Sequence, residues 1–370
     1  MAAISMDPRF NRSYKNHHHH NLNGGATVEE EIEGLIRVSK DGRVERPAII
    51  PNVPPTWSLN KNLVTSKDVV MDKNTNLWAR IYVPAAAAPP LTGHQLKPLL
   101  VYFHGGGFCV GSAAWSCYHE FLANLCTKAN CIIVSVNYRL APENRLPAAY
   151  EDGFNALMWI KHQAQTQSSS SSSNSSWLSQ CNMSSLFLAG DSAGASIAYH
   201  VATTRLAAAA SDDAVLRPFR LKGVILIQPF VGGETRTGSE KYGSQPSNNS
   251  ALTLSASDTY WRLSLPLGAN RDHPWCNPLI NINGESANKY LMRPNNNNHN
   301  NVGVMVCVSE MDILRDRNLA LCNALVSSGK KVEMVMYKGV GHAFQILHNS
   351  SYSQLRTQEM MSHIKNFVHQ

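Results

Sequence analysis

Short apolar runs alternate with amphipathic stretches along most of this 370-residue chain, and this alternation restricts the fold more than any other feature. The runs are PLLVYF, CIIVSVNY, SSLFLAG, LKGVILIQ, VGVMVCVS and KVEMVMY, and the amphipathic stretches include 149–163, 193–207 and 315–328. Uninterrupted apolar strands that alternate with helices are typical of a mostly parallel sheet covered by helices on both faces. Before them, GLIRVSKDGRVERP and TSKDVVMDKNTNLWARIYVP alternate apolar and polar residues around turns, which predicts antiparallel hairpins. We therefore expect one α/β domain over residues 27–370.

Polar segments of low complexity indicate where no chemistry is expected. Residues 1–26 contain no apolar stretch that could act as a secretory signal or membrane anchor, and we predict a disordered polar tail. Within this tail, the histidines His17 to His20 are surrounded by Asn and Gly, which cannot hold a coordination geometry, so we expect no metal site. The runs at 168–176, 207–210 and 295–301 are predicted to be surface loops.

The net charge and the cysteines indicate which binding partners and which cellular compartment to expect. The formal net charge is +7, but the Lys and Arg residues are scattered, so we expect neither a nucleic-acid partner nor insertion into a membrane. The eight cysteines form no CxxC pair and are predicted to be free thiols, as in a reducing compartment. We expect a cytoplasmic protein, with the nucleus left open as a second location. The oligomeric state stays open.

The stretch LLVYFHGGGFCVG, residues 99–111, runs from an apolar strand into His104 and the glycines Gly105, Gly106 and Gly107. Glycine continues neither a strand nor a helix well, so this backbone needs a reason. One interpretation is a flexible loop. The other is that the missing Cβ atoms let backbone N–H groups converge on an anion, as an oxyanion hole requires. A second motif downstream is needed to choose between them.

That second motif is GDSAG at 190–194, which fits the pattern GxSxG, follows an apolar strand and precedes a helical pattern. Glycines two residues either side of Ser192 permit a strained strand-to-helix turn that presents the hydroxyl at the strand end. A turn of small residues that packs a helix on a strand is the alternative. Because HGGG stands upstream in the right order, we predict that Ser192 is a nucleophile.

A serine hydroxyl is a poor nucleophile at neutral pH, so the site also needs a base and an acid that orients the base. After a GxSxG serine these partners follow in chain order, acid before histidine. Asp312 follows one apolar strand and His342 follows the next, in loops at strand ends. Glu310 and Asp316 are rival acids, but Glu310 belongs to the strand end and Asp316 to the following helix. A helix-capping role is the alternative for Asp312.

The predicted base is His342, because among the 15 histidines it alone combines flanking glycines with a loop after a predicted strand. The alternative is a surface position or a satisfied polar contact, and that is how we interpret the histidines in helical or tail patterns. These are His119, His162, His200 and His348.

Five segments together carry a family resemblance: HGGGF at 104–108, NYRLAPENRLPAAYED at 137–152, GDSAGASIAYH at 190–200, MDILRD at 311–316 and GHAF at 341–344. From about Glu29 to the C-terminus the chain resembles the plant carboxylesterases of the hormone-sensitive-lipase type. The resemblance implies an α/β-hydrolase fold with a helical cap built from the N-terminal segment and residues 232–295. It also implies that Tyr138 to Glu143 brace the oxyanion loop, with no catalytic role for Arg139 or Glu143.

The same resemblance implies a catalytic site without metal or organic cofactor. Ser192 would be the nucleophile, with Asp312 and His342 as its partners. The oxyanion hole would be made by the N–H groups of three residues, Gly106, Gly107 and Ala193.

The family also includes members that are not hydrolases. Gibberellin receptors replace the catalytic histidine with an aliphatic residue and the last HGGG glycine with serine, whereas this chain keeps His342 and Gly107. Lyases of the isoflavanone dehydratase kind usually carry threonine at the nucleophile position, which is Ser192 here. Alkaloid-forming cyclases of the family change the motifs little. We therefore expect a serine carboxylesterase acting on a small or medium ester, with a receptor and a dehydratase or cyclase-type lyase as alternatives.

Overall fold

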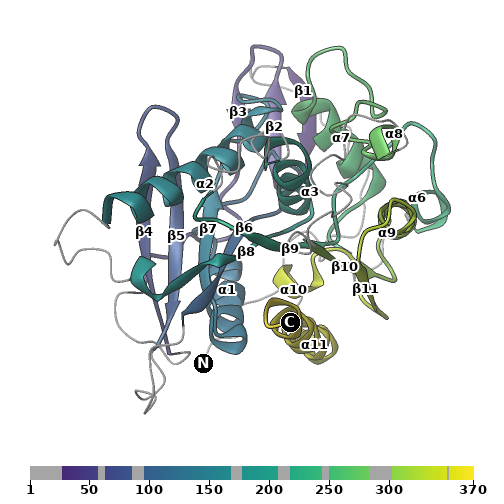
Figure 1. The fold of residues 1–370 in the computed structure, drawn as a ribbon. Coiled ribbons are helices and arrows are strands. Elements are labelled where there is room, and N and C mark those ends of the chain that lie inside the picture. The colour runs from purple at the N-terminus through teal and green to yellow at the C-terminus, as the bar shows by residue number, and fades with distance from the viewer. Residues whose placement is uncertain are drawn as a thin grey trace.

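The structure of this chain, a computed structural model, describes residues 27–56, 63–85, 96–167, 177–206, 217–243, 250–282, 302–347 and 350–370. Within these ranges an eight-stranded sheet has the strand order β11-β10-β9-β8-β6-β7-β5-β4 (Figure 1). The strands are β4 (Val64–Asp72), β5 (Leu77–Pro84), β6 (Lys97–Phe103), β7 (Ile132–Asn137), β8 (Cys181–Asp191), β9 (Leu221–Ile227), β10 (Gly303–Ser309) and β11 (Val332–Tyr337).

The six apolar runs of the sequence form the parallel part of this sheet. Strands β6 to β11 pair in parallel with their neighbours, whereas β4 and β5 are antiparallel to each other and β5 is antiparallel to β7. Because parallel strands end at the same edge, the segments that follow β6, β8, β10 and β11 are gathered there. The predicted α/β class with a mostly parallel sheet is confirmed.

Helices cover both faces of the sheet, and alternate strand residues face opposite layers. On β6, Leu99 and Val101 pack into the core under α2, α3 and α9, whereas Leu100 and Tyr102 pack under α1 and α11. These helices are α1 (Ser116–Ala129), α2 (Ala148–Gln167), α3 (Ala193–His200), α9 (Arg315–Ser327) and α11 (Ser351–Val368). Shorter elements are η2 (Leu178–Gln180), the π-turn η3 (Val201–Arg205) and α10 (Phe344–Leu347).

Two segments outside the sheet and its covering helices lie near the carboxyl ends of the strands (Figure 1). The N-terminal segment forms a separate three-stranded sheet of β1 (Val28–Ile32), β2 (Ile36–Ser39) and β3 (Val44–Glu45). The second segment carries α6 (Gly238–Tyr242), α7 (Leu254–Ser264) and α8 (Leu279–Ile282). Arg262 on α7 pairs with Glu30 on β1 at 2.6 Å, which joins the two segments. Of the predicted cap segment 232–295, residues 244–249 and 283–295 lie outside the described residues.

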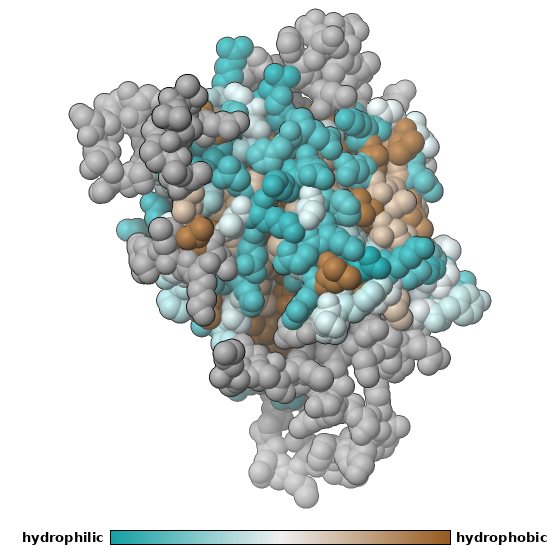
Figure 2. Space-filling model, turned by 90° about the horizontal axis from the view of Figure 1, so that it is seen from below, coloured by the Kyte–Doolittle hydropathy of each residue, from teal (hydrophilic) through white to brown (hydrophobic). Residues whose placement is uncertain are grey.

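The predicted tail 1–26 and the predicted loops at 168–176, 207–210 and 295–301 also lie outside the described residues. In Figure 2 the face at the bottom of Figure 1 is mostly hydrophilic, with apolar residues in small separate groups. Scattered apolar residues of this kind are ordinary on a protein surface. Among the described helices, none combines the length and apolar character that crossing a membrane requires.

Candidate active site

Ser192 lies at a strained turn between β8 and α3. Its backbone has φ 52° and ψ −120°, a conformation that a residue with a Cβ adopts only where its surroundings hold it. A Cβ at Gly194 would overlap the carbonyl oxygen of Phe103, and one at Gly190 would overlap the backbone of Gly194. The flanking glycines therefore let helix α3 approach the sheet closely, while Ser192 stands out at the strand end.

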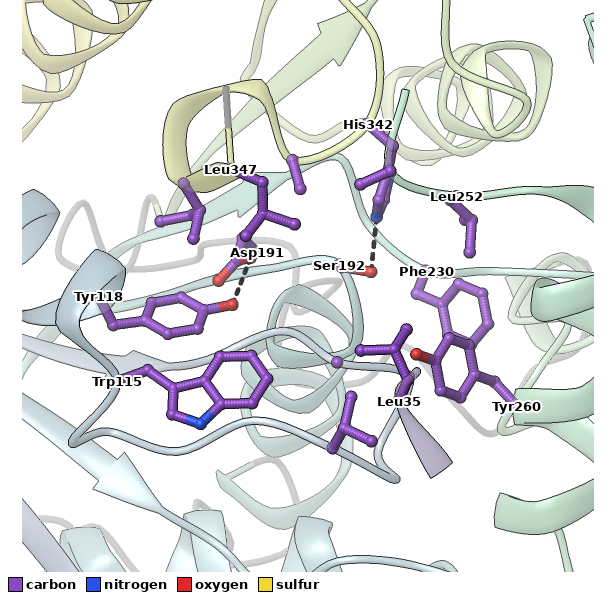
Figure 3. Close-up of a pocket in the computed structure, with 16 residues that line it drawn as sticks. Leu35, Trp115, Tyr118, Asp191, Ser192, Phe230, Leu252, Tyr260, His342 and Leu347 are labelled. Atoms are coloured by element: carbon purple, nitrogen blue, oxygen red, sulfur yellow. Dashed lines mark hydrogen bonds between the residues drawn. The ribbon is translucent and has the colours of Figure 1, made fainter. Parts of the chain in front are cut away.

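A continuous chain of hydrogen bonds joins the three residues that the sequence analysis singled out. Nε2 of His342 lies 2.8 Å from Oγ of Ser192 (Figure 3). Nδ1 of His342 lies 2.7 Å from Oδ2 of Asp312. The second oxygen of Asp312 accepts the N–H of Leu314 at 3.0 Å. Ser192, Asp312 and His342 are 7%, 2% and 4% exposed, so little water competes for these bonds. Strands β8, β10 and β11 bring the three side chains together from distant parts of the chain.

The rival acids have other partners. The carboxylate of Glu310 accepts the N–H of Gly339 at 2.8 Å. Asp316 lies in the first turn of α9 and accepts the N–H of Ser239 at 2.7 Å. Asp312 therefore is the acid that the structure places against His342.

The other histidines lie away from this chain of bonds or outside the described residues. His119 contacts Thr56 at 3.2 Å, and His200 stacks on Tyr150 with ring centroids 3.9 Å apart. His162 lies on α2, and His348 is outside the described residues.

The backbone conformation and the packing of the glycine-rich loop explain why it contains so much glycine. Gly106, Gly107 and Phe108 are consecutive residues with positive φ, of 116°, 58° and 64°. A Cβ at Gly106 would overlap the carbonyl oxygen of Val110, and one at Gly107 would overlap the ring of Tyr260. At Gly106 and Gly107 the left-handed conformation disfavours a side chain and the close packing leaves no space for one, so both positions require glycine.

His104, the first residue of the HGGG motif, is fully buried at 0% exposure. Its ring stacks on Tyr138 with centroids 4.3 Å apart, and its Nδ1 lies 2.8 Å from the carbonyl oxygen of Gly105. Burial lowers its pKa to about 4, because a charged imidazolium would lose its hydration. A neutral, stacked ring suits His104 to shaping the loop rather than to transferring protons.

A cavity of about 560 Å³, which includes open space at its mouth, lies over Ser192. Gly106, Gly107 and His342 are among its lining residues. Figure 3 shows Trp115 and Tyr118 on one side of Ser192, with Phe230 and Tyr260 on the other. The described wall also contains large aliphatic side chains, including those of Leu35, Leu252, Ile346 and Leu347. An apolar wall around a few polar groups is typical of a small-molecule site. The described residues contain no cluster of His, Cys, Asp and Glu that could hold a metal ion.

A family profile described as the α/β hydrolase fold matches residues 100–346. The chain belongs to this family. A second profile, for the carboxylesterase family, matches residues 53–143 of this α/β hydrolase. The predicted α/β-hydrolase fold is thereby confirmed.

Individual relatives and one solved structure give more specific similarities than the family profiles. The hydrolase is 46% identical over 349 residues, 94% of each chain, to a protein of Arabidopsis thaliana described as probable carboxylesterase 6. It is 34% identical to the gibberellin receptor GID1B of Arabidopsis thaliana, over 81% of this chain and 76% of the receptor. A solved esterase from Pyrobaculum calidifontis superposes with a TM-score of 0.60 at 25% identity, over 81% of this chain and 84% of the esterase. The predicted resemblance to plant carboxylesterases is confirmed.

Asp191 of this hydrolase is a site residue that the sequence analysis missed. Its Oδ1 accepts the hydroxyl of Tyr102 at 2.8 Å and the N–H of Gly105 at 3.0 Å, and its Oδ2 accepts the hydroxyl of Tyr118 at 2.9 Å. Burial raises the pKa of Asp191 to about 6, and these hydrogen bonds offset part of the rise because they stabilise the carboxylate. Asp191 thus ties the glycine-rich loop to the turn at Ser192. The available signal was a carboxylate directly before Ser192.

Arg46 is a second residue that the sequence analysis missed. Its guanidinium donates to the carbonyl oxygens of Cys109 at 2.7 Å and Ala141 at 2.8 Å, and it pairs with Glu143 at 2.6 Å. Ala141 in turn donates its N–H to the carbonyl of Phe108 at 2.9 Å. The 138–143 stretch therefore contacts the glycine-rich loop from outside, and Arg46 fastens both to the N-terminal segment.

Proposed function

We propose that this chain is a serine carboxylesterase that hydrolyses a small or medium carboxylic ester through an acyl-enzyme intermediate. The observation that carries the proposal is the chain of hydrogen bonds from Ser192 through His342 to Asp312, at the floor of an apolar cavity. The carboxylesterase relative that matches 94% of the chain supports the same reaction class.

In the first half of the reaction, His342 accepts the proton of Ser192 as Oγ attacks the ester carbonyl carbon. The carbonyl electron pair moves to its oxygen, which becomes an oxyanion. We assign the stabilising N–H groups to Gly106, Gly107 and Ala193, because the first two line the cavity beside Ser192 and the third begins helix α3. His342 then gives its proton to the leaving alcohol as the carbon–oxygen bond breaks.

In the second half, water replaces the alcohol. His342 takes a proton from the water as the water oxygen attacks the acyl carbon. It then returns the proton to Oγ of Ser192 as the acid leaves. Asp312 keeps the imidazole in the tautomer whose Nε2 can accept, and stabilises its charged form. Every step uses groups of this chain and water.

We propose a cap that shapes the substrate cavity from two segments, the N-terminal one and residues 232–295. Leu35 from the first segment, with Leu252 and Tyr260 from the second, lines the cavity together with the loops of the sheet. These apolar residues favour uncharged acyl and alcohol groups.

We further propose that the protein works in the cytoplasm, with the nucleus as a second compartment to test. Its eight cysteines are described and all are free thiols, which suits a reducing compartment. Fractionation of plant cells that express a tagged chain would locate it, and recovery from the cell wall or a secretory compartment would contradict the proposal.

The test is a panel of aryl and alkyl acetates in water labelled with heavy oxygen. We expect label in the released acid, and Ser192→Ala should lower kcat by up to about a millionfold while the variant stays folded. His342→Val should also abolish turnover, because the proton acceptor is gone. Undiminished hydrolysis by pure Ser192→Ala protein would overturn the proposal.

The 34% identity to a gibberellin receptor makes small-molecule binding the second candidate. Isothermal titration with small plant metabolites separates the two functions. Tight binding by the parent protein, with no turnover of any ester, would favour the receptor. An unlabelled product that has lost water or formed a ring would instead indicate a lyase.

A further inference from the structure

One short segment after β9 contacts the nucleophile turn and strand β10. The carbonyl of Ile227 accepts the N–H of Ser192 at 2.8 Å, and the N–H of Phe230 donates to the carbonyl of Ser192 at 3.0 Å. Between them, the N–H of Gln228 donates to the carbonyl of Cys307 on β10 at 2.8 Å. The side chain of Gln228 therefore leaves the backbone close to both the Ser192 turn and strand β10.

The side chain of Gln228 extends this connection to the acid and base loops. Gln228 is 0% exposed, and both ends of its amide are used. Its Nε2 donates to Oγ of Ser309 at 2.6 Å, at the end of β10 and three residues before Asp312. Its Oε1 accepts the N–H of Ala343 at 2.7 Å, directly after His342. A buried amide that lost these partners would be left unpaired, so the contacts restrict its position strongly.

The hydrogen bond between Gln228 and Ala343 joins two strained residues. Gln228 has φ 48° and Ala343 has φ 59°, which are left-handed conformations that residues with a Cβ seldom adopt. Strained backbone of this kind persists where surrounding contacts hold it, and it gathers at functional sites. The amide of Gln228 is such a contact for the peptide that follows His342.

We infer that Gln228 is a positioning residue: its carboxamide holds the His342 loop against the acid loop, so that the imidazole stays within reach of Ser192. The inference rests on the proposed hydrolase function. A misplacement of about 1 Å in a catalytic group can cost on the order of a hundredfold in rate. Gln228 is not among the described residues that line the cavity, so its loss should lower kcat with little change in KM.

The test compares Gln228→Leu with Gln228→Glu and with a matched control, Gln345→Leu. Glutamate keeps an acceptor for the N–H of Ala343, whereas leucine does not. Gln345 lies two residues after Ala343, is 7% exposed, and has no hydrogen-bond partner for its amide within the described residues. Two further proteins carry His342→Ala, one alone and one combined with Gln228→Leu. Each is assayed for kcat, KM and urea unfolding with one aryl acetate.

Gln228→Leu should lower kcat on the order of a hundredfold with KM within about threefold, and Gln228→Glu should recover most of that loss. Gln345→Leu should stay within about twofold of the parent in both constants. In the His342→Ala background, Gln228→Leu should cause no further loss, because Gln228 acts through His342.

A folded Gln228→Leu protein with parental kcat would overturn the inference, and so would an equal further loss in the His342→Ala background. If the leucine variant does not fold, Gln228→Asn replaces it, since this change keeps the amide but withdraws it by one methylene. The same split between kcat and KM is then expected. A parent protein without any ester hydrolysis would instead refute the proposed function.

Discussion

At the scale of single residues, the site depends on positions where backbone conformation and burial leave little choice of side chain. Ser192, Gly106 and Gly107 all have positive φ. Asp191 and His104 are buried titratable groups whose pKa values move in opposite directions, up for the acid and down for the base, for the same physical reason. Burial disfavours whichever form is charged. Two predictions belong to this scale.

The first prediction concerns Gly106. Replacement by valine should lower kcat by at least about a hundredfold, comparable with the loss of an oxyanion donor, because a Cβ would meet the carbonyl of Val110. Steady-state kinetics with an aryl acetate measures this loss. The control is Gly42→Ala. Gly42 also has a positive φ, 84°, but a Cβ added there would have no atom within 4 Å. It should lose stability but keep its activity, and full activity of folded Gly106→Val would contradict the oxyanion role.

The second prediction concerns the stability that Asp191 contributes as pH changes. Its pKa is about 6 in the folded protein, against about 3.9 for an ordinary Asp, so between these values the native state holds more protons than the unfolded state. The free energy of unfolding contributed by this group therefore falls as pH rises through about 6. Relative to Asp191→Asn, the parent should be more stable at about pH 4.5 than at about pH 7.5 by about 2 kcal/mol.

Urea unfolding of both proteins at the two pH values measures this difference. A constant difference would show that the carboxyl group of Asp191 titrates in its ordinary range, and one of opposite sign would show that its pKa is lowered in the folded protein. Because both proteins share every other titratable group, the comparison reports the titration of Asp191 together with its electrostatic coupling to His342.

At the scale of elements, the N-terminal sheet contributes to the site although none of its described strands pairs with the main sheet. It supplies Leu35 to the cavity wall, and Arg46, directly after β3, holds the glycine-rich loop through Cys109. Three consecutive left-handed residues end at Phe108. Of the three, only Phe108 has a Cβ and is strained there, and it is held from outside the loop by the N–H of Ala141, while Arg46 holds the next carbonyl, that of Cys109.

Arg46→Lys tests that contact. A lysine ammonium is a point charge and cannot reach two carbonyls and both oxygens of Glu143 together, so kcat should fall about tenfold with little change in KM. Kinetics and thermal unfolding are measured in parallel. The control is Arg37→Lys on β2, whose pair with Glu31 is exposed and should be replaceable. Equal activity of the two variants would show that the loop holds its shape without Arg46.

At the scale of the whole molecule, the topology of the sheet brings the residues of the site together. The residues of the candidate site follow β6, β8, β10 and β11, which lie far apart in the sequence but end at one edge of the sheet. The two core layers on either side of the sheet hold these strand ends in place. The described segments outside the main sheet complete an apolar cavity around Ser192, in which the carboxylate of Asp191 is the acidic lining group.

This cavity predicts discrimination by charge. The acetate ester of 4-hydroxybenzamide should be hydrolysed with kcat/KM at least about tenfold higher than that of 4-hydroxybenzoate, because a buried carboxylate beside Asp191 would lose its hydration. The two esters have nearly the same shape. Leu35→Arg should raise kcat/KM for the anionic ester relative to the neutral one. Equal rates on both esters with the parent would show that the aryl group stays in water.

The sequence by itself determined the strands of the main sheet, several of the helices and the motifs. Apolar runs became parallel strands because burial on both faces demands continuous apolar residues, and this requirement is local enough to read from the chain. The predicted helix starts at 193 and 315 coincide with α3 and α9. GDSAG and HGGG were recognisable because a turn between strand and helix needs glycine at particular positions.

Only the tertiary structure decided which polar groups meet. Nothing in the local pattern distinguishes Gln228, with both ends of its amide paired, from Gln345, with neither end paired within the described residues. Arg46 lies 63 residues before Cys109, whose carbonyl it holds. Asp312 contacts His342 because β10 and β11 end side by side, whereas its neighbours Glu310 and Asp316 contact Gly339 and Ser239. Strand and helix patterns are local properties of a chain, whereas hydrogen-bond partners and the desolvation of Asp191 depend on what the fold places around each group.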